Sequence, residues 1–457
     1  RIPLGRVSVY RLADAYRWRG WRALPRFYWY GGLRVPDFHD VRDVLAIVLA
    51  GGQGERLHPL TQDRAKPAVQ FGGQYRLIDF TLSNCLNSQC RRVLVLVQYK
   101  SLSLVRHIRE GWGMLSRDLD EYIEPLPAQK RVGEDWYLGT ADAIYQNMYS
   151  IEPAEPAEVL ILSGDHIYKM NYGEMIAFHR RNKSDMTIAT LQMPIEQANR
   201  FGVLEVDYTA QVIGFQEKPV NPAPVPDSPD TALASMGVYV FNANILKEAV
   251  TADANNKQSS HDFGKDIIPQ LIKSHKVFAY MFRDENKKDM PYWRDVGTLD
   301  SYWEANMDLV SIDPIFNLYD QDWPIRTHLH NLPPAKFVFG AEGVRFGAAV
   351  DSIVSAGCIV SGGLVKRSVL SPNVRVNSYS HVEESILLPG CNVGRNCRIR
   401  RAIIERNVSI PENTVIGYDA HEDAKRFSVS TGGVVVVAGT EHTPLVPNAE
   451  RMPYHAG

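Results

Sequence analysis

Continuous apolar runs alternate with helix-like segments over the first two thirds of the chain. Three of these runs are residues 47–50 (IVLA), 93–98 (VLVLVQ) and 159–164 (VLILSG). Strands without apolar–polar alternation are typical of a sheet that is covered on both faces, as parallel sheets are. Between the second and third runs, residues 140–151 predict a helix with Thr140 as its N-cap. From about residue 44 to residue 313 the pattern therefore predicts an α/β fold with a mostly parallel sheet.

The apolar pattern changes after about residue 340. An apolar residue then recurs at every sixth position, and five-residue steps join one series to the next. The positions are Ile353, Ile359, Val365, Leu370, Val376, Val382, Leu388, Val393, Ile399, Ile404, Ile410 and Ile416. This spacing is typical of a hexapeptide β-helix, and twelve positions in register argue against a set of ordinary short strands.

Composition narrows the class of protein. At 457 residues, 45% hydrophobic and 22% charged, the chain is ordinary for a globular protein and too long for one core. A formal net charge of -2 provides no field that attracts nucleic acid or an anionic membrane. No apolar run approaches the roughly 18 residues that are needed to cross a bilayer. Five cysteines without a C-x-x-C pair favour reduced thiols. We therefore expect a cytoplasmic protein of two domains that binds neither nucleic acid nor membrane.

Residues 1–40 differ from everything after them. They contain eight Arg, no Lys, three Trp and a single Ser, and they begin without Met. Arginines interrupt any apolar core that a secretory signal would need, and a plastid transit peptide would be rich in Ser. We expect this extension to be disordered or not native coding sequence, with Val41 as the natural start.

The strand at residues 47–50 leads into the most specific motif of the chain, GGQGERL, which Lys66-Pro67 follows. Glycine lets backbone N–H groups approach a phosphate closely, and Arg56 and Lys66 add positive charge beside the loop. The motif is neither a Walker loop nor G-x-G-x-x-G, because Leu57 stands three residues after Gly54. The glycines and the two cations together indicate a loop that binds phosphate.

Two aspartates from distant segments form a candidate metal site. Asp165 follows a buried strand in SGDHIY, and Asp295 lies in YWRDVGT. Such a pair suits a Mg²⁺ ion on triphosphate oxygens, because Mg²⁺ prefers hard oxygen ligands. Either residue alone would be an ordinary turn or loop acid. His166 and His261 show no metal-ligand spacing and are interpreted as structural.

Other residues have the chemistry of a sugar phosphate site. Lys218 offers a compact positive charge, Glu217 accepts bonds from hydroxyl groups, and Ser235 offers a hydroxyl ahead of an apolar run. No pair of nucleophile and general base is evident. We therefore expect catalysis by alignment of two reactants and by neutralisation of charge on the transferred group.

From about Val44 to about Phe427 the chain resembles the bacterial ADP-glucose pyrophosphorylases, or glucose-1-phosphate adenylyltransferases. The matching motifs are LAGGQGERL, RAKPAVQFGG, RLIDFTLSN, WYLGTADA, GDHIYKM, FGVLEV, EKP, LASMGVYVF, SSHDFGKDIIP, PYWRDVGT, WPIRT and LPPAKF. DHIYKM and SSHDFGKD separate this family from UDP- and dTDP-sugar relatives. The resemblance implies a GT-A/Rossmann-like nucleotidyltransferase domain followed by a left-handed parallel β-helix. We expect these domains at residues 41–313 and 341–440, a connector at 314–340 and a tail at 441–457.

The resemblance also implies an activity and its residues. The reaction joins ATP and glucose 1-phosphate into ADP-glucose and pyrophosphate for glycogen synthesis, with Mg²⁺ as cofactor, in a homotetramer that small metabolites regulate. The implied ATP site comprises Leu49, Ala50, Gly51, Gly52, Gly54, Gln98 and Gly139. The implied glucose 1-phosphate site comprises Tyr137, Gly202, Glu217, Lys218 and Ser235. The implied catalytic residues are Arg56, Lys66 and Asp165, and the implied metal ligands are Asp165 and Asp295.

Regulation is where the sequence departs from enterobacterial members of this family. Those members have a lysine three residues before the signature Lys-Pro, which contributes to activation by fructose 1,6-bisphosphate; here that residue is Asp63. A histidine nearby is replaced by Gln70, although Arg64 and Arg76 remain as a candidate effector site. Because an acid repels an anionic effector, we expect a weak or absent response to fructose 1,6-bisphosphate.

Three alternatives stay open at this point. The same architecture could use UTP or dTTP, the chain could be a catalytically silent regulatory subunit, or the β-helix could serve as an assembly scaffold. Silent subunits commonly lose charged residues, but Arg56, Lys66, Asp165, Lys218 and Asp295 are all present. A scaffold leaves the N-terminal motifs unexplained.

Overall fold

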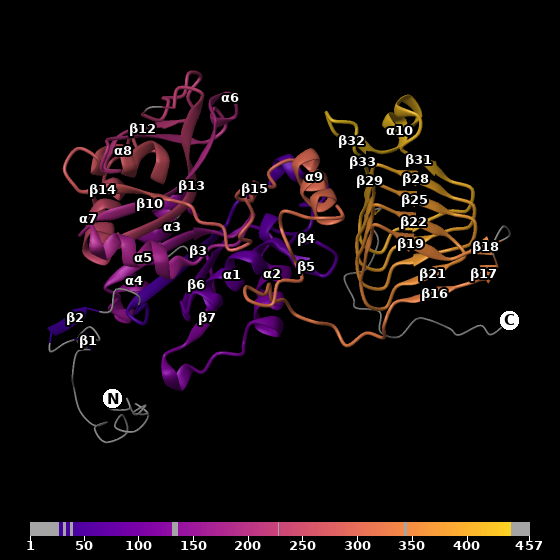
Figure 1. Ribbon diagram of the computed structural model, residues 1–457, viewed down its shortest axis with the longest axis horizontal. Coiled ribbons are helices and arrows are strands. Elements are labelled where there is room, and N and C mark those ends of the chain that lie inside the picture. The colour runs from indigo at the N-terminus through magenta and orange to yellow at the C-terminus, as the bar shows by residue number, and fades with distance from the viewer. Residues whose placement is uncertain are drawn as a thin grey trace, which may run out of the picture.

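An α/β part and a β-helix lie side by side along the longest axis of the molecule, joined by an extended connector (Figure 1). This computed structural model describes residues 27–30, 33–36, 40–129, 136–226, 228–341 and 345–439. Strands β1 (Phe27–Tyr30) and β2 (Leu33–Pro36) pair as a hairpin within the expected extension. The rest of that extension before Asp40, and the expected tail, lie outside the described residues.

One sheet runs through the α/β part in the order β12-β11-β13-β8-β3-β6-β7, and β10 pairs with both β13 and β14. Its strands are β3 (Val44–Ala50), β6 (Arg92–Val97), β7 (Tyr122–Pro127), β8 (Glu158–Ser163), β10 (Met186–Pro194), β11 (Gly202–Val206), β12 (Val212–Glu217), β13 (Thr231–Asn242) and β14 (Val277–Met281). The half from β8 to β7 is parallel, whereas β13 runs antiparallel to β8 and β10. The carboxyl ends of β3, β6 and β8 therefore meet at one edge.

Both faces of this sheet are covered, which explains the apolar runs. Along β3, Val44, Ala46 and Val48 pack toward α1, α2 and α5, while Leu45 and Ile47 pack toward α3, α7 and α8. The helices of this part are α1 (Leu77–Asn87), α2 (Leu102–Gly111), α3 (Thr140–Gln146), α4 (Met148–Ile151), α5 (Tyr172–Arg181), α6 (Ile195–Ala198), α7 (Ala243–Ala254), α8 (Ile268–Leu271) and α9 (Leu299–Leu309). Burial on both sides makes every strand position apolar.

The predicted helix at residues 140–151 differs in two details. It is divided at Asn147 into α3 and α4, and its N-cap is Gly139 rather than Thr140. The Thr140 hydroxyl is used elsewhere: it accepts a hydrogen bond from the backbone N–H of Phe263 at 3.1 Å and lies 3.3 Å from Asp262 Oδ2. A tertiary contact therefore replaces the local cap.

The C-terminal part is a parallel β-helix built from three sheets. The first contains β16 (Lys336–Val338), β21 (Ile359–Ser361), β24 (Arg375–Val376), β27 (Asn392–Val393) and β30 (Ser409–Ile410). The second contains β19 (Ala348–Val350), β22 (Leu364–Lys366), β25 (His381–Glu383), β28 (Arg398–Arg400) and β31 (Val415–Ile416). The third contains β20 (Ile353–Val354), β23 (Val369–Leu370), β26 (Ile386–Leu387), β29 (Ala402–Ile404), β33 (Val435–Val437) and β32 (Ser428–Val429). Helix α10 (Ala420–Arg426) follows the last full coil.

The register corrects three predicted positions of the hexapeptide series. Ile353 and Ile359 pair with Val369 and Arg375, whose places face out of the coil, so Val354 and Val360 take the two internal places instead. Leu370, Leu387 and Ile404 occupy equivalent places in successive coils, and all three pack inside the β-helix. Leu388 is therefore wrong as the internal residue; it is buried instead in the cluster between the two parts. The five-residue step falls before Leu387, not after Leu388.

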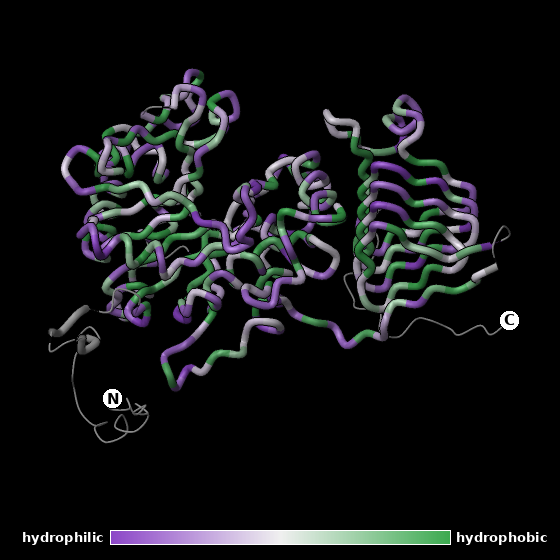
Figure 2. Tube along the Cα trace, viewed as in Figure 1, coloured by the Kyte–Doolittle hydropathy of each residue, from purple (hydrophilic) through white to green (hydrophobic). Residues whose placement is uncertain are grey.

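The third sheet of the β-helix packs against the α/β part. Val369, Ile386 and Ile403 point out of the coil and share one apolar cluster with Leu299 and Trp303 of α9. Figure 2 shows the corresponding hydrophobic strip on the side of the β-helix that faces α9. Outward-facing residues of these strands are thus apolar because the α/β part covers them.

Within the described residues, no helix is both long enough and apolar enough to span a membrane.

Candidate functional site

A cavity of about 1180 Å³ lies at the carboxyl edge of β3, β6 and β8. Nearly all of the predicted site residues line it: Leu49, Ala50, Gly51, Gly52, Arg56, Lys66, Gln98, Tyr137, Gly139, Asp165, Gly202, Glu217, Lys218, Ser235 and Asp295. Three predicted residues do not line it, namely Gly54, Arg64 and Arg76. One cavity therefore brings together segments that are far apart in the sequence.

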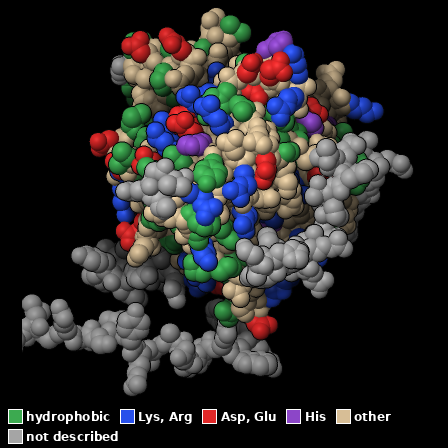
Figure 3. All heavy atoms as spheres, turned by 90° about the vertical axis from the view of Figure 1, so that its right-hand side faces the viewer, with side chains coloured by type: hydrophobic (Ala, Val, Ile, Leu, Met, Phe, Trp, Pro, Cys, Tyr) green, Lys and Arg blue, Asp and Glu red, His purple; other side chains and the backbone are tan. Residues whose placement is uncertain are grey.

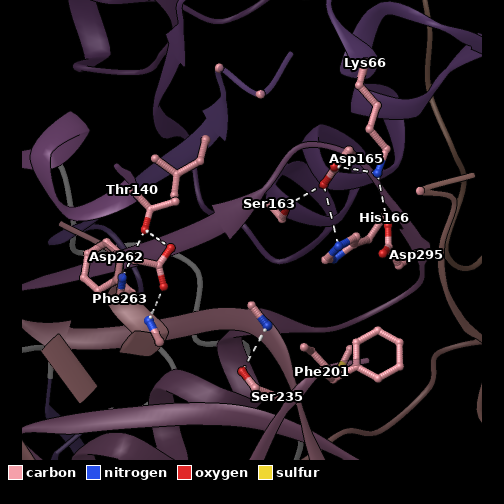
Figure 4. A pocket seen from close by; sticks show the side chains of 18 of the residues that line it. Lys66, Thr140, Ser163, Asp165, His166, Phe201, Ser235, Asp262, Phe263 and Asp295 are labelled. Carbon is pink, nitrogen blue, oxygen red and sulfur yellow. Dashed lines mark hydrogen bonds and ion pairs between the residues drawn. The ribbon is translucent and has the colours of Figure 1, made fainter. Parts of the chain in front are cut away.

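Lys66 joins the two predicted metal ligands. Its Nζ lies 2.8 Å from Asp165 Oδ2 and 3.0 Å from Asp295 Oδ1 (Figure 4). Strand pairing produces this meeting, because β9 (His166–Tyr168) runs antiparallel to β15 (Trp293–Asp295) and places Asp295 opposite His166. The Ser163 hydroxyl also donates to Asp165, which fixes that carboxylate at the end of β8.

The electrostatics of this cluster keep Lys66 and Asp165 charged at neutral pH. Burial by itself would raise the pKa of the Asp165 carboxyl, but the charge and hydrogen bond of Lys66, together with smaller contributions from His166 and Ser163, outweigh it and hold this pKa well below its usual range. Burial by itself would lower the pKa of the Lys66 ammonium, but Asp165 and Asp295 together raise it. The cluster is therefore a pair of carboxylates with a cation between them.

The residues present fit a divalent metal ion, and the structure adds a third donor. Asp165, His166 and Asp295 each offer a ligand atom, and these atoms lie within 4.8 Å of one another. His166 Nε2 is 3.6 Å from Asp165 Oδ1, and its buried Nδ1 has no hydrogen-bond partner among the described residues. The sequence interpretation treated His166 as structural; its place directly after Asp165, at a strand end, was the available signal.

The glycines of the loop after β3 have different roles. A Cβ atom on Gly51 would lie 3.3 Å from Gln98 Cβ, so the loop passes close to the end of β6. A Cβ atom on Gly52 would meet no atom within 4 Å, so this glycine leaves space in the cavity itself. Gly54 has φ +68°, and a Cβ atom there would lie 3.0 Å from Lys66 Cβ. Gly54 thus shapes the turn and supports Lys66, rather than lining the cavity.

Two glycines leave room for Glu217 at the end of β12. A Cβ atom would lie 2.7 Å from Glu217 Oε2 if placed on Gly264 and 3.1 Å from it if placed on Gly202. Lys218, the next residue, is largely exposed and pairs with Glu217 Oε1 at 3.0 Å. This end of the cavity thus presents an acceptor and a flexible cation.

Tyr137 also lines the cavity, beside Gln98 at the end of β6. Its hydroxyl accepts a hydrogen bond from Asn147 Nδ2 at 2.8 Å, and burial raises its pKa. Its backbone carbonyl accepts a bond from Gln98 Nε2 at 3.4 Å. The phenol is therefore a neutral group that can bind a hydroxyl or pack against a ring.

The sequence interpretation missed several other lining residues. Asp262, Phe263 and Gly264 follow the SSH stretch and approach Glu217, and Figure 4 shows Asp262 across the cavity from Asp165. Asp300 and Thr431 also line the cavity, the second from the β-helix. His261 does not line it; its Nδ1 lies 2.7 Å from Asp253 Oδ2, which agrees with a structural role. Only the motif that contains residues 262–264 signalled any of these positions.

In comparison with known proteins, a different family model matches each of the two parts of the chain. The family model described as Nucleotidyl transferase matches residues 45–311, and the model described as GlmU-like, C-terminal hexapeptide matches residues 333–437. A relative from Koribacter versatilis (strain Ellin345), named "Glucose-1-phosphate adenylyltransferase", is 56% identical over 414 residues, which cover 90% of this chain and 99% of the relative. The chain belongs to the glucose-1-phosphate adenylyltransferase family.

Two further members of this family support the assignment. The relative with the same name from Methylococcus capsulatus is 54% identical over 396 residues, 87% of this chain and 93% of the relative. That from Rhodopirellula baltica is 53% identical over 423 residues, 91% of this chain and 95% of the relative. Nucleotidyltransferases of this kind generally use a divalent metal, and the carboxylate pair of the cavity suits one.

Proposed function

We propose that this protein transfers the adenylyl group of ATP to glucose 1-phosphate, which gives ADP-glucose and pyrophosphate for glycogen synthesis. The name of its relatives supports this reaction. The observation that carries the proposal is the single cavity in which the glycine loop, the Lys66 cluster and the Glu217–Lys218 pair meet. Two anionic substrates need such a set of N–H groups and cations at one place.

Each substrate has its own side of the cavity in this proposal. ATP lies on Leu49–Gly52, Gln98 and Gly139, with Arg56 and Lys66 on its triphosphate. Glucose 1-phosphate lies on Tyr137, Gly202, Glu217, Lys218 and Ser235, with the Lys218 ammonium on its phosphate. The sugar hydroxyls then face Glu217, whose carboxylate accepts hydrogen bonds.

The reaction needs alignment more than acid–base chemistry. An oxygen of the sugar phosphate attacks the α-phosphorus, and the bond from that phosphorus to the oxygen of the leaving pyrophosphate breaks. The attacking oxygen is already anionic, so no side chain has to remove a proton. Arg56 and Lys66 stabilise the charge that gathers on the transferred group, and the glycine loop holds the nucleotide in line.

We propose Mg²⁺ as the metal ion, with Asp165 and Asp295 as its protein ligands. Carboxylate oxygens are the ligands that Mg²⁺ prefers, and it keeps several waters besides. When bound, the ion neutralises charge on the phosphate oxygens. Lys66, whose ammonium lies beside both carboxylates, would contact the triphosphate.

The test compares three nucleoside triphosphates with glucose 1-phosphate and measures released pyrophosphate. We expect ATP to exceed UTP and dTTP by at least about tenfold in kcat/KM, because contacts to the base decide between them. A faster reaction with UTP or dTTP would favour the related sugar-nucleotide activity. No product with any of the three would favour a silent regulatory subunit.

Assembly and location complete the proposal. We propose a cytoplasmic homotetramer in which residues 41–313 catalyse and the β-helix, whose first strand is β16 (Lys336–Val338), helps assembly. Figure 3 shows hydrophobic side chains beside Lys and Arg on the side of the β-helix that faces away from the α/β part. Phe339, directly before β17 (Gly340–Ala341), and Phe346, in β18 (Arg345–Phe346), are 42% and 52% exposed. Exposed aromatic side chains of this kind favour contact between subunits.

The candidate effector residues lie at the junction of the two parts rather than in the cavity. Arg64 Nη2 lies 3.1 Å from Glu405 Oε1, and Arg76 Nη1 donates to the carbonyl of Ser103 at 2.8 Å. Burial lowers the pKa of Arg76 to about 10; Asp79 opposes this, whereas Arg64 and Arg406 lower it further. An anionic metabolite would relieve this mutual repulsion, so we propose that regulatory anions bind here.

A further inference from the structure

The cavity has a wall that comes from the β-helix. Thr431 lines it together with Asp300, which lies in the first turn of α9. Thr431 belongs to the turn between β32 and β33, in which the Ser430 hydroxyl accepts a hydrogen bond from the N–H of Val434 at 2.9 Å. The C-terminal part therefore reaches the site of its own chain.

The contact between these segments is a set of hydrogen bonds to one carboxylate. Asp300 Oδ1 accepts from the Ser430 hydroxyl, and Asp300 Oδ2 accepts from Thr431 Oγ1 and from the backbone N–H of Gly432, both at 3.1 Å. A Cβ atom on Gly432 would lie 2.5 Å from Asp300 Oδ1, so this approach requires glycine. Donors to both oxygens fix the carboxylate in position and orientation.

A second set of contacts also joins this turn to α9. Arg401 Nη2 donates to the carbonyl of Gly432 at 3.1 Å, and its guanidinium lies 4.2 Å from the centre of the Trp303 ring. The indole N–H of Trp303 donates to the carbonyl of Glu384 at 2.8 Å. The start of α9 is thus held by three segments of the β-helix.

The contact between Asp300 and the turn holds the segment that carries Asp295. Val296 is fully buried in the cluster between the two parts, and a Cβ atom on Gly297 would lie 3.0 Å from Arg56 Nη2 and 3.1 Å from Asp295 Oδ2. Only four residues separate Asp295 from Asp300. A displacement of Asp300 therefore moves the backbone beside both the metal ligand and Arg56.

We propose that Asp300 and the turn at Ser430–Gly432 form a latch by which the β-helix positions Asp295, so that Asp300 is a positioning residue for metal binding. This inference rests on the metal site of the proposed function. The β-helix thereby does more than assemble subunits: a shift of its last turn alters the affinity of the cavity for the divalent ion.

The experiment breaks the latch from either side. Asp300→Asn keeps the shape but presents an NH₂ group to the turn, and the double variant Ser430→Ala/Thr431→Val removes two donors while the charge of Asp300 stays. Asp419→Asn is the matched control, because Asp419 also accepts two backbone N–H bonds, from His421 and Glu422 at the start of α10. Full-length proteins are compared throughout.

Binding of Mn²⁺ alone, followed by EPR, and the Mg²⁺ concentration at half-maximal rate are the readouts. We expect both latch variants to weaken Mn²⁺ binding and to raise the Mg²⁺ requirement by about tenfold, as loss of a residue that supports a metal ligand does. The control should change neither, even if its Tm falls.

Unchanged metal binding in both latch variants, with a lower Tm, would reduce the contact to ordinary packing and overturn the proposal. Weaker metal binding in Asp300→Asn alone would assign the effect to the negative charge of Asp300 at the start of α9. That result would also overturn the latch. If the wild type forms no ADP-glucose, the proposed function fails, whereas the Mn²⁺ comparison still decides the latch.

Discussion

Lys66 places a positive charge where two carboxylates would otherwise repel each other. Its side chain is 10% exposed, and those of Asp165 and Asp295 are 23% and 27% exposed. Burial of charges is costly unless each has a partner, and here one ammonium group serves both acids. The residue that we propose for the triphosphate therefore also keeps the two acids paired with a cation in the structure.

Replacing Lys66 with Gln should change how stability depends on pH. In the wild type the lowered pKa of Asp165 gives stability that is present above the ordinary value of 3.8 and is lost on acidification below it. Without Lys66, burial and the facing Asp295 raise that pKa, so protonation now relieves repulsion. We expect the variant to be less stable at pH 7 by about 2 kcal/mol, with a deficit that shrinks toward about pH 5.

Urea unfolding across this pH range measures the effect. Lys100→Gln is the control, because the Lys100 ammonium donates to the carbonyl of Thr61 at 2.9 Å instead of to an acid. A Lys66→Gln deficit that stays constant with pH would show that the lysine does not govern the ionisation of Asp165.

Replacing Asp165 with Asn should abolish turnover and leave the fold intact. An amide coordinates Mg²⁺ poorly and carries no charge to hold Lys66, so we expect kcat to fall at least about a thousandfold. The control is Asp207→Asn, a turn residue that accepts bonds from Thr209 and Gln211 outside the cavity. Near-normal turnover of ADP-glucose formation would remove Asp165 from the mechanism.

At the scale of elements, strand ends and helix starts form the cavity, and small residues decide how closely they meet. A Cβ atom on Gly139, the N-cap of α3, would lie 2.2 Å from the carbonyl oxygen of His261. Its φ of -165° is extended backbone, so the need for glycine is one of space and not of conformation. The loop at residues 260–262 thus fits directly against the start of the helix.

Two alanine substitutions distinguish a glycine that the packing of the protein requires from a glycine that leaves room for a ligand. Gly139→Ala should destabilise the protein by about 1–3 kcal/mol, because backbone atoms must move to accept the methyl group. Gly52→Ala meets nothing within 4 Å, so its Tm should equal that of the wild type while its KM for ATP rises. A stable Gly139→Ala, or a Gly52→Ala with unchanged kinetics, would contradict this division.

At the scale of the whole molecule, the two parts share a continuous apolar cluster and a buried ion pair. Arg64, whose side chain is 4% exposed, pairs with Glu405 of the β-helix, which is 11% exposed. Arg64 Nη1 also donates to Gln70 Oε1 at 3.3 Å. The junction is therefore tightly packed yet carries charge, which suits a place where an anion can act.

Replacing one member of the Arg64–Glu405 pair should lower the free energy of unfolding more than replacing both members does. We expect Glu405→Leu alone to lower stability by about 3 kcal/mol, because it leaves the Arg64 charge buried, and Arg64→Met/Glu405→Leu to cost less. Thermal unfolding of the single and double variants measures the coupling. The exposed pair Arg117–Glu124, at 3.1 Å, should show almost none. If the stability losses of the single variants add up to the loss of the double variant, Arg64 and Glu405 are not a coupled pair.

The sequence predicted those features that depend on local pattern. Apolar runs indicated β3, β6 and β8, and Asp165 and the glycine loop, each directly after such a run, were candidate site residues that do line the cavity. The six-residue period indicated the β-helix, but a period alone cannot tell where a five-residue step falls. Both Leu387 and Leu388 are apolar, and only pairing with Leu370 and Ile404 distinguishes them.

By itself the sequence determined the two architectures, the family, and the residue types of the cavity, because periodicity and motif spacing are properties of neighbouring residues. Only the tertiary structure decided that Lys66 bridges Asp165 and Asp295, that His166 joins them, and that Thr431 closes the wall beside Asp300. Lys66 and Asp295 are 229 residues apart in the sequence, and Asp300 and Thr431 are 131 apart. Strand pairing and domain packing create these contacts, and neither leaves a local trace in the chain.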